Sequence, residues 1–179
     1  IFRPSKNNII QQYILAVSSI TPHKNFNNLI KAYNALNNDS IKLFLVGSTN
    51  ISFNDVDIDK KINKNIVFKG RVSDQELVDL YTNAICFIHP SFYEGFGIPP
   101  LEAQSCGTPV ISSNAASLPE VGLDSFLYFD PKDVNQLADN INMLLFDIEL
   151  RESLIIKGHE NIRRFSWKKS ADLIIKVLV

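Results

Sequence analysis

The chain has 179 residues, and its 45% hydrophobic content is enough for one domain with a full core. Its 18 Lys and Arg residues nearly balance its 19 Asp and Glu residues, so net charge gives no reason to expect a nucleic acid or a strongly anionic membrane as a partner. Two cysteines, Cys86 and Cys106, favour a cytoplasmic protein with reduced thiols over a disulfide scaffold, and no apolar run is long enough to span a membrane.

The first half of the chain alternates predicted strands with predicted helices. Short apolar runs at 13–18, 42–47 and 66–69 are typical of buried strands. Ser73, followed three residues later by Glu76, is the pattern of a capping box that begins a helix. Between the first two strands, apolar residues recur at helical spacing: Phe26, Leu29, Ile30, Tyr33 and Leu36.

The second half continues the same alternation. Further strands are predicted at 84–88, 109–112 and 126–129, and the chain closes with three predicted helices, at 133–146, 149–164 and 166–178. Strands that alternate with helices predict an α/β fold, a doubly wound parallel sheet of Rossmann-like type. We find no internal repeat or long linker and expect residues 1–179 to form a single domain.

A lysine follows the first predicted strand. Lys24 comes after the loop from Ser18 to His23 and before the helix that begins near Asn25. In a parallel sheet, ligands bind beyond the carboxyl ends of the strands, where such a lysine can reach a phosphate and stabilise a leaving diphosphate. The alternative is a solvated lysine at a helix end.

A glycine-rich turn follows the strand at 84–88. Gly95 and Gly97 allow a sharp turn and close approach of the backbone to a ligand. Pro99 and Pro100 suit the first turn of a helix, which Gly107 ends. The N–H groups of Gly97, Ile98 and Leu101 are expected to point outward at the positive end of the helix dipole and to form an anion cradle.

Two glutamates flank this cradle. Glu102, in the first turns of the helix, can accept hydrogen bonds from a ribose diol, and Glu94 precedes the turn, where a sugar on the distal phosphate would lie. The alternative is that Glu102 only complements the helix dipole and that Glu94 is a solvated loop residue.

The run EGFGIPPLEAQSCGTPVISSNAASLPEV resembles the signature of retaining glycosyltransferases of the GT-B fold, of the family 4 type. The resemblance implies that the chain is one half of a GT-B enzyme. It also implies that Glu94 contacts the donor sugar, that Lys24 lies on the diphosphate, and that these two are the catalytic residues. Glu102 would hold the ribose, and the loop would bind the diphosphate through Gly95, Phe96, Gly97, Ile98 and Leu101.

The resemblance assigns further donor-binding positions at other strand ends. Gly47 matches a glycine turn that approaches the nucleotide, and Arg71 and Val72 lie where the base is read. Ser19 occupies the position where the family usually has an arginine, which weakens the positive site. His89 is expected either as a strand-end hydrogen bonder or as a residue lining the donor pocket.

The resemblance predicts transfer of a hexose from UDP- or GDP-hexose to a hydroxyl of a glycan or lipid-linked acceptor, in bacterial surface polysaccharide synthesis. The chain begins at Ile1 without a methionine, and we expect a carboxyl-terminal donor domain whose amino-terminal acceptor half is absent. That missing half would be its partner and would contact the inner face of the membrane. The alternatives are a non-catalytic nucleotide-sugar binding module, favoured by Ser19, and a GT-B sugar-nucleotide epimerase.

No metal or other cofactor is expected. The acidic pairs within residues 55–59 match the spacing of a divalent-metal site, but their polar surroundings favour a solvated helix start. The histidines His23, His89 and His159 are too scattered in sequence to indicate a metal set.

Overall fold

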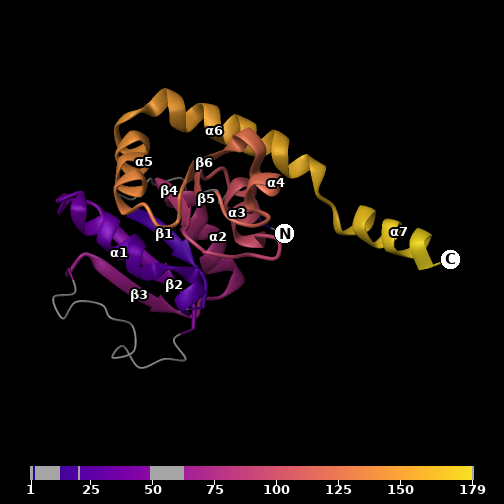
Figure 1. Ribbon diagram of the computed structural model, residues 1–179, viewed down its shortest axis with the longest axis horizontal. Helices are drawn as coiled ribbons and strands as arrows, with labels where there is room; N and C mark the ends of the chain where they lie inside the picture. The colour runs from indigo at the N-terminus through magenta and orange to yellow at the C-terminus, as the bar shows by residue number, and fades with distance from the viewer. Residues whose placement is uncertain (1, 3–12, 20, 49–62, 179) are drawn as a thin grey trace.

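The computed structural model describes residues 2, 13–19, 21–48 and 63–178 of the chain (Figure 1). Within these residues six parallel strands form one sheet in the order β3-β2-β1-β4-β5-β6. The order reverses direction between β1 and β4, as in dinucleotide-binding folds. The strands are β1 (Tyr13–Val17), β2 (Lys42–Val46), β3 (Ile66–Gly70), β4 (Cys86–His89), β5 (Val110–Ser113) and β6 (Phe126–Phe129).

The sheet is buried on both faces because successive side chains of a strand point to opposite sides. In β1, Ile14 and Ala16 enter one apolar cluster, whereas Tyr13 and Leu15 enter the other. All four side chains are almost fully buried. The continuous apolar run of β1 is therefore what a central strand of a covered parallel sheet requires.

Helices cover each face of the sheet. Side chains of α1 (Phe26–Ala35), α5 (Val134–Phe146) and α6 (Ile148–Asn161) pack into the first cluster. Side chains of α2 (Asp74–Asn83) and α3 (Ile98–Ser105) pack into the second. The shorter elements are η1 (Pro22–Lys24), α4 (Leu118–Gly122), η2 (Leu123–Ser125) and η3 (Ile162–Arg164).

The predicted fold class is confirmed, with small differences at the ends of elements. The capping box at Ser73 is present, with the Ser73 side chain accepting from the Glu76 amide and the Glu76 side chain accepting from the Ser73 amide. The helix predicted over 149–164 ends at Asn161, and its last three residues form η3. The turn η1, which carries Lys24, was predicted only as a loop.

The last helix, α7 (Trp167–Leu178), projects away from the sheet and its helices (Figure 1). None of its described side chains is buried, although one side of the helix is apolar. Trp167 is 83% exposed and Leu178 is 79% exposed. This helix therefore contributes nothing to the core of the described chain.

Gly47 allows β2 to pass close to the loop that follows β1. Its φ is +144°, and a Cβ at this position would lie 1.9 Å from the Ser18 carbonyl oxygen. The neighbouring hydrogen bond from the Ser18 amide to the Val46 carbonyl, 2.9 Å long, fixes this approach. Contact with the Ser18 backbone by itself requires a glycine here, and the approach of Gly47 to a nucleotide, implied by the resemblance, stays a prediction.

Replacing Gly47 with alanine is expected to lower the free energy of unfolding by about 2–4 kcal/mol, because the added Cβ overlaps the Ser18 backbone and the φ is strained. Urea denaturation measures this change. Gly95→Ala is the matched control, because a Cβ at Gly95 meets nothing within 4 Å. Equal losses in the two variants would contradict the contact.

Candidate functional site

A crevice is expected where the strand order reverses. After β1 the chain crosses to α1 on one face of the sheet, and after β4 it crosses to α3 on the other. The two loops therefore separate at the carboxyl ends of neighbouring strands, which is where open α/β sheets bind ligands. The turn η1 borders the crevice on the β1 side, and residues 90–97 border it on the β4 side.

Lys24 and Glu94, predicted separately from the sequence, meet at this crevice. The Lys24 Nζ lies 2.6 Å from the Glu94 Oε1, and both side chains are largely covered, at 16% and 14% exposed. The Ser91 hydroxyl donates to the same oxygen at 2.7 Å. The His89 Nε2 lies 2.9 Å from it, although its ring N–H is not aligned for a hydrogen bond.

These neighbours keep Glu94 ionised. Burial by itself raises the pKa of Glu94, but the contacts with His89, Lys24 and Ser91 outweigh burial and lower the pKa to about 2. The crevice therefore holds a fixed negative charge and a fixed positive charge side by side at neutral pH.

Hydrogen bonds to backbone carbonyls tie the loops around this pair together. The Phe92 amide donates to the His23 carbonyl at 2.8 Å, which joins the loop after β4 to η1. The buried Asn25 side chain donates to the carbonyls of Pro90 and Pro131, at 2.9 and 2.7 Å. The Ser113 hydroxyl, at the end of β5, donates to the Ser91 carbonyl at 2.6 Å. Three loops thus hold the ion pair in place.

The amino end of α3 carries the amides that were predicted to face an anion. Gly97 is the N-cap, with φ +100°, and Ile98 is the first residue of the helix. Because Pro99 and Pro100 have no N–H, the amides at this end are those of Gly97 and Ile98, followed by that of Leu101. That the Leu101 N–H is free to bind an anion stays a prediction.

Of the two glycines in the turn, Gly97 occupies a position that requires glycine and Gly95 does not. Gly97 has a positive φ, and a Cβ there would lie 2.8 Å from the Leu118 side chain. Gly95 has neither a positive φ nor a close neighbour. The Ser117 hydroxyl donates to the carbonyls of Glu94 and Phe96, at 3.0 and 3.2 Å, and holds the turn between them.

Glu102 faces α2. The Tyr81 hydroxyl donates to the Glu102 Oε2 at 3.2 Å, and Tyr81 is fully buried. Burial raises the pKa of Glu102; the Tyr81 hydrogen bond lowers it and the nearby Asp74 charge raises it, so that the net change is upward. The sequence did not indicate the contact of Tyr81 with Glu102, because it spans 21 positions along the chain.

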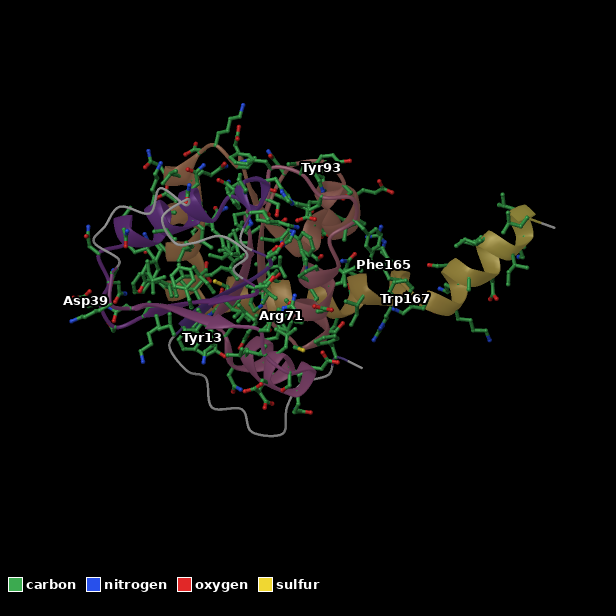
Figure 2. All side chains as sticks on the ribbon, turned by 90° about the horizontal axis from the view of Figure 1, so that it is seen from below. Tyr13, Asp39, Arg71, Tyr93, Phe165 and Trp167 are labelled. Atoms are coloured by element: carbon green, nitrogen blue, oxygen red, sulfur yellow. The ribbon has the colours of Figure 1, made fainter. Side chains whose placement is uncertain are left out.

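The other predicted residues lie at neighbouring strand ends. Ser19 is exposed, immediately after the Ser18 carbonyl that approaches Gly47. Arg71 is exposed after β3, and Val72 packs against the second apolar cluster. Figure 2 shows Arg71 and Tyr93, which follow strands, displaced from Asp39, which precedes β2, toward the other side of the molecule.

Aromatic side chains surround the turn between Ser91 and α3. Phe92, Tyr93 and Phe96 are 40%, 67% and 45% exposed. Phe96 makes an edge-to-face contact with Phe165, with ring centroids 5.6 Å apart. The surface beside the crevice is therefore apolar as well as charged.

Within the described ranges, no group of three or more His, Cys, Asp and Glu side chains is arranged to hold a metal ion. The acidic pairs at 55–59 lie outside the described residues. No helix among those described has the length and apolar character needed to cross a membrane.

A pocket lies at the opposite edge of the sheet. Its volume is about 420 Å³, and its lining includes Ile41, before β2, Ile85, before β4, and Arg151 of α6. None of the candidate site residues predicted from the sequence lines this pocket. This pocket is the alternative location for a ligand.

Comparison with known proteins gives a family match. The model of the family described as glycosyl transferases group 1 matches residues 2–161. The chain is 37% identical over 164 residues to O-antigen chain mannosyltransferase B of Escherichia coli, covering 88% of this chain and 43% of that protein. It is 35% identical over 167 residues to O-antigen chain mannosyltransferase RfbU of Salmonella typhimurium, covering 92% and 46%. The chain thus spans less than half the length of these relatives.

Solved structures share the fold. The crystal structure of Anabaena Alr3699/HepE in complex with UDP-glucose superposes with a TM-score of 0.81 at 22% identity, over 96% of this chain and 49% of that one. At this identity the likeness shows the fold alone.

Glu94→Gln is expected to make the chain less sensitive to acid. Because the pKa of Glu94 is lowered on folding, its ionised form stabilises the fold above about pH 4.5, and this contribution is lost as the pH falls toward 2. Between about pH 5 and pH 3 the original chain should lose about 1–2 kcal/mol more unfolding free energy than the variant. Denaturant titrations at both pH values measure the difference. Parallel losses in the two proteins would contradict the lowered pKa.

Proposed function

The chain belongs to the family of group 1 glycosyl transferases, and we propose that it forms the carboxyl-terminal, donor-binding half of a retaining GT-B enzyme. In this proposal the enzyme moves a hexose from UDP- or GDP-hexose to a hydroxyl of a glycan or lipid-linked acceptor, in bacterial surface polysaccharide synthesis. The observation that carries the proposal is the meeting of Lys24 and Glu94 at the β1–β4 crevice.

The diphosphate of the donor is proposed to lie between Lys24 and the amino end of α3. Lys24 supplies a full positive charge, and the amides of Gly97 and Ile98 supply hydrogen bonds at the positive end of the helix dipole. Glu94, which reaches Lys24 from the β4 side of the crevice, then lies where the sugar joins the distal phosphate. This arrangement supports a donor rather than a simple phosphate as the ligand.

The ribose and base are proposed to extend toward α2 and β3. Glu102 would accept hydrogen bonds from the ribose hydroxyls, with Tyr81 holding one carboxylate oxygen. Arg71 and Val72, after β3, would border the base. Two relatives are named for mannosyl transfer, and one structure of the same fold was solved with UDP-glucose. Both UDP and GDP are therefore nucleotides to test.

The proposed reaction is a front-face displacement with retention at the sugar carbon. The bond from the anomeric carbon to the diphosphate oxygen breaks, and the acceptor oxygen bonds to the same face of that carbon. The acceptor proton passes to the leaving phosphate. Lys24 and the α3 amides would stabilise the departing diphosphate, and Glu94 would orient the sugar and stabilise the positive charge that develops on it.

We propose that transfer needs no metal ion. A divalent cation on a diphosphate supplies positive charge, and in this site Lys24 and the α3 dipole would supply it. Nucleotide binding in the presence of a chelator supports the proposal, whereas binding that requires added Mg²⁺ counts against it.

We infer the remaining parts of the enzyme from the length of its relatives. Because these relatives are about twice as long as this chain, we assign the acceptor site to an amino-terminal half that this sequence does not show. We keep the expectation of a cytoplasmic enzyme whose missing half contacts the inner face of the membrane.

Glu102→Ala is expected to weaken nucleotide binding by about 1.5–3 kcal/mol, the range for hydrogen bonds to a charged group. Calorimetric titration with UDP and GDP, in the presence of a chelator, measures the loss. Glu152→Ala, at an exposed position of α6, is the control and should bind as the original chain does. Unchanged affinity in Glu102→Ala would remove this residue from the site.

The 179 residues alone are expected to bind the donor without transferring the sugar, because the acceptor site is assigned to the missing half. A radiolabelled sugar-nucleotide assay with lipid-linked and glycan acceptors tests this expectation. A robust rate of transfer from this chain would show that its own residues complete the active site.

A further inference from the structure

The two carboxylate oxygens of Glu94 differ in the contacts that they make. Lys24, Ser91 and His89 all lie within 2.9 Å of Oε1. No hydrogen bond or ion pair to Oε2 is found in the described part of the chain. Oε1 is therefore the anchored oxygen, and Oε2 is the oxygen that remains for a ligand.

Glu94 and the proposed donor diphosphate compete for the single positive charge of Lys24. In the described structure its ammonium group neutralises Glu94. The proposed function requires the same group on the diphosphate of the donor. Because a diphosphate carries more negative charge than a single carboxylate, it would draw Lys24 away from Glu94.

The other neighbours of Glu94 can hold it when Lys24 moves. Ser91 is buried, and its hydroxyl already donates to Oε1. His89 is 2% exposed, and its Nε2 lies near Oε1 without an aligned hydrogen bond. With its proton on Nε2, His89 can turn this contact into a hydrogen bond and keep the carboxylate in place.

We propose that Lys24 is exchanged from Glu94 to the donor diphosphate, so that donor binding uncovers the charge of Glu94 beside the sugar while Ser91 and His89 hold its carboxylate. This inference rests on the proposed function of the site. Its consequence is that the Glu94 charge becomes available to the sugar only when the diphosphate is bound. Ser91 and His89 are then positioning residues for Glu94.

The exchange predicts that Glu94 opposes the binding of a nucleoside diphosphate that carries no sugar. Such a ligand must break the Lys24–Glu94 pair and gains no contact with Glu94 in return. Glu94→Gln should therefore tighten UDP or GDP binding by about three- to tenfold, the effect of removing a competing ion pair. A residue that only binds the donor would give no such gain.

A double-mutant cycle followed by calorimetry with UDP and GDP tests the exchange. Lys24→Met should weaken binding, and in the Lys24→Met background Glu94→Gln should no longer tighten it, because the competition is already gone. Glu152→Gln, which removes the same charge from an exposed position of α6, is the control and should bind as the original chain does. Thermal unfolding checks that each variant is folded.

The outcomes separate this inference from the proposed function. If the original chain binds a nucleotide and Glu94→Gln binds it equally or more weakly, the exchange is wrong and the donor site stands. If neither protein binds any nucleotide, both proposals fall. If Glu94→Gln does not fold, Glu94→Asp, whose shorter side chain draws back from Lys24, should tighten binding in the same direction, and unchanged binding would overturn the exchange.

Discussion

The separation of two loops at the centre of the parallel sheet determines where the functional side chains of this chain can meet. After β1 the chain turns to one face, and after β4 it turns to the other, so the ends of these paired strands cannot be bridged by a short connection. Lys24 from one loop and Glu94 from the other meet there, 70 positions apart along the chain.

Hydrogen bonds and one close backbone contact hold Lys24 and Glu94 in position. The buried Asn25 side chain fastens η1 to the carbonyls of Pro90 and Pro131, and Ser113 fastens the loop after β4 from the next strand. Gly47 lets the end of β2 approach Ser18 closely, which fixes the start of the loop that leads to η1. A site built on rigid strand ends in this way needs little rearrangement to accept a charged ligand.

The sequence predicted the elements of the fold because their signals are local. The strand at 126–129 was predicted with its observed limits, and the capping box at Ser73 follows from two residues three positions apart. Strand order could not be read in this way, because it depends on which distant segments pair. The contact of Tyr81 with Glu102 likewise has no signal in the spacing of the two residues.

The predictions for the site differed in kind. Lys24, Glu94 and the turn at Gly97 were identified by residue type and by position after strands, and the structure places them around one crevice. Which amides lack partners inside the helix depends on the position of the N-cap, which the structure places at Gly97, and the free amide assigned to Leu101 stays a prediction. The mutual neutralisation of Lys24 and Glu94 was not predicted, since each had been considered only with a ligand.

We propose that a nucleoside diphosphate binds in the crevice between β1 and β4. Backbone amide chemical shifts of this chain, followed by NMR during titration with UDP and with GDP, test this binding. The largest changes are expected on the amides of Gly97 and Ile98 and on the turn that carries Lys24. Changes centred on Ile41, Ile85 and Arg151, around the pocket at the opposite edge of the sheet, would contradict it.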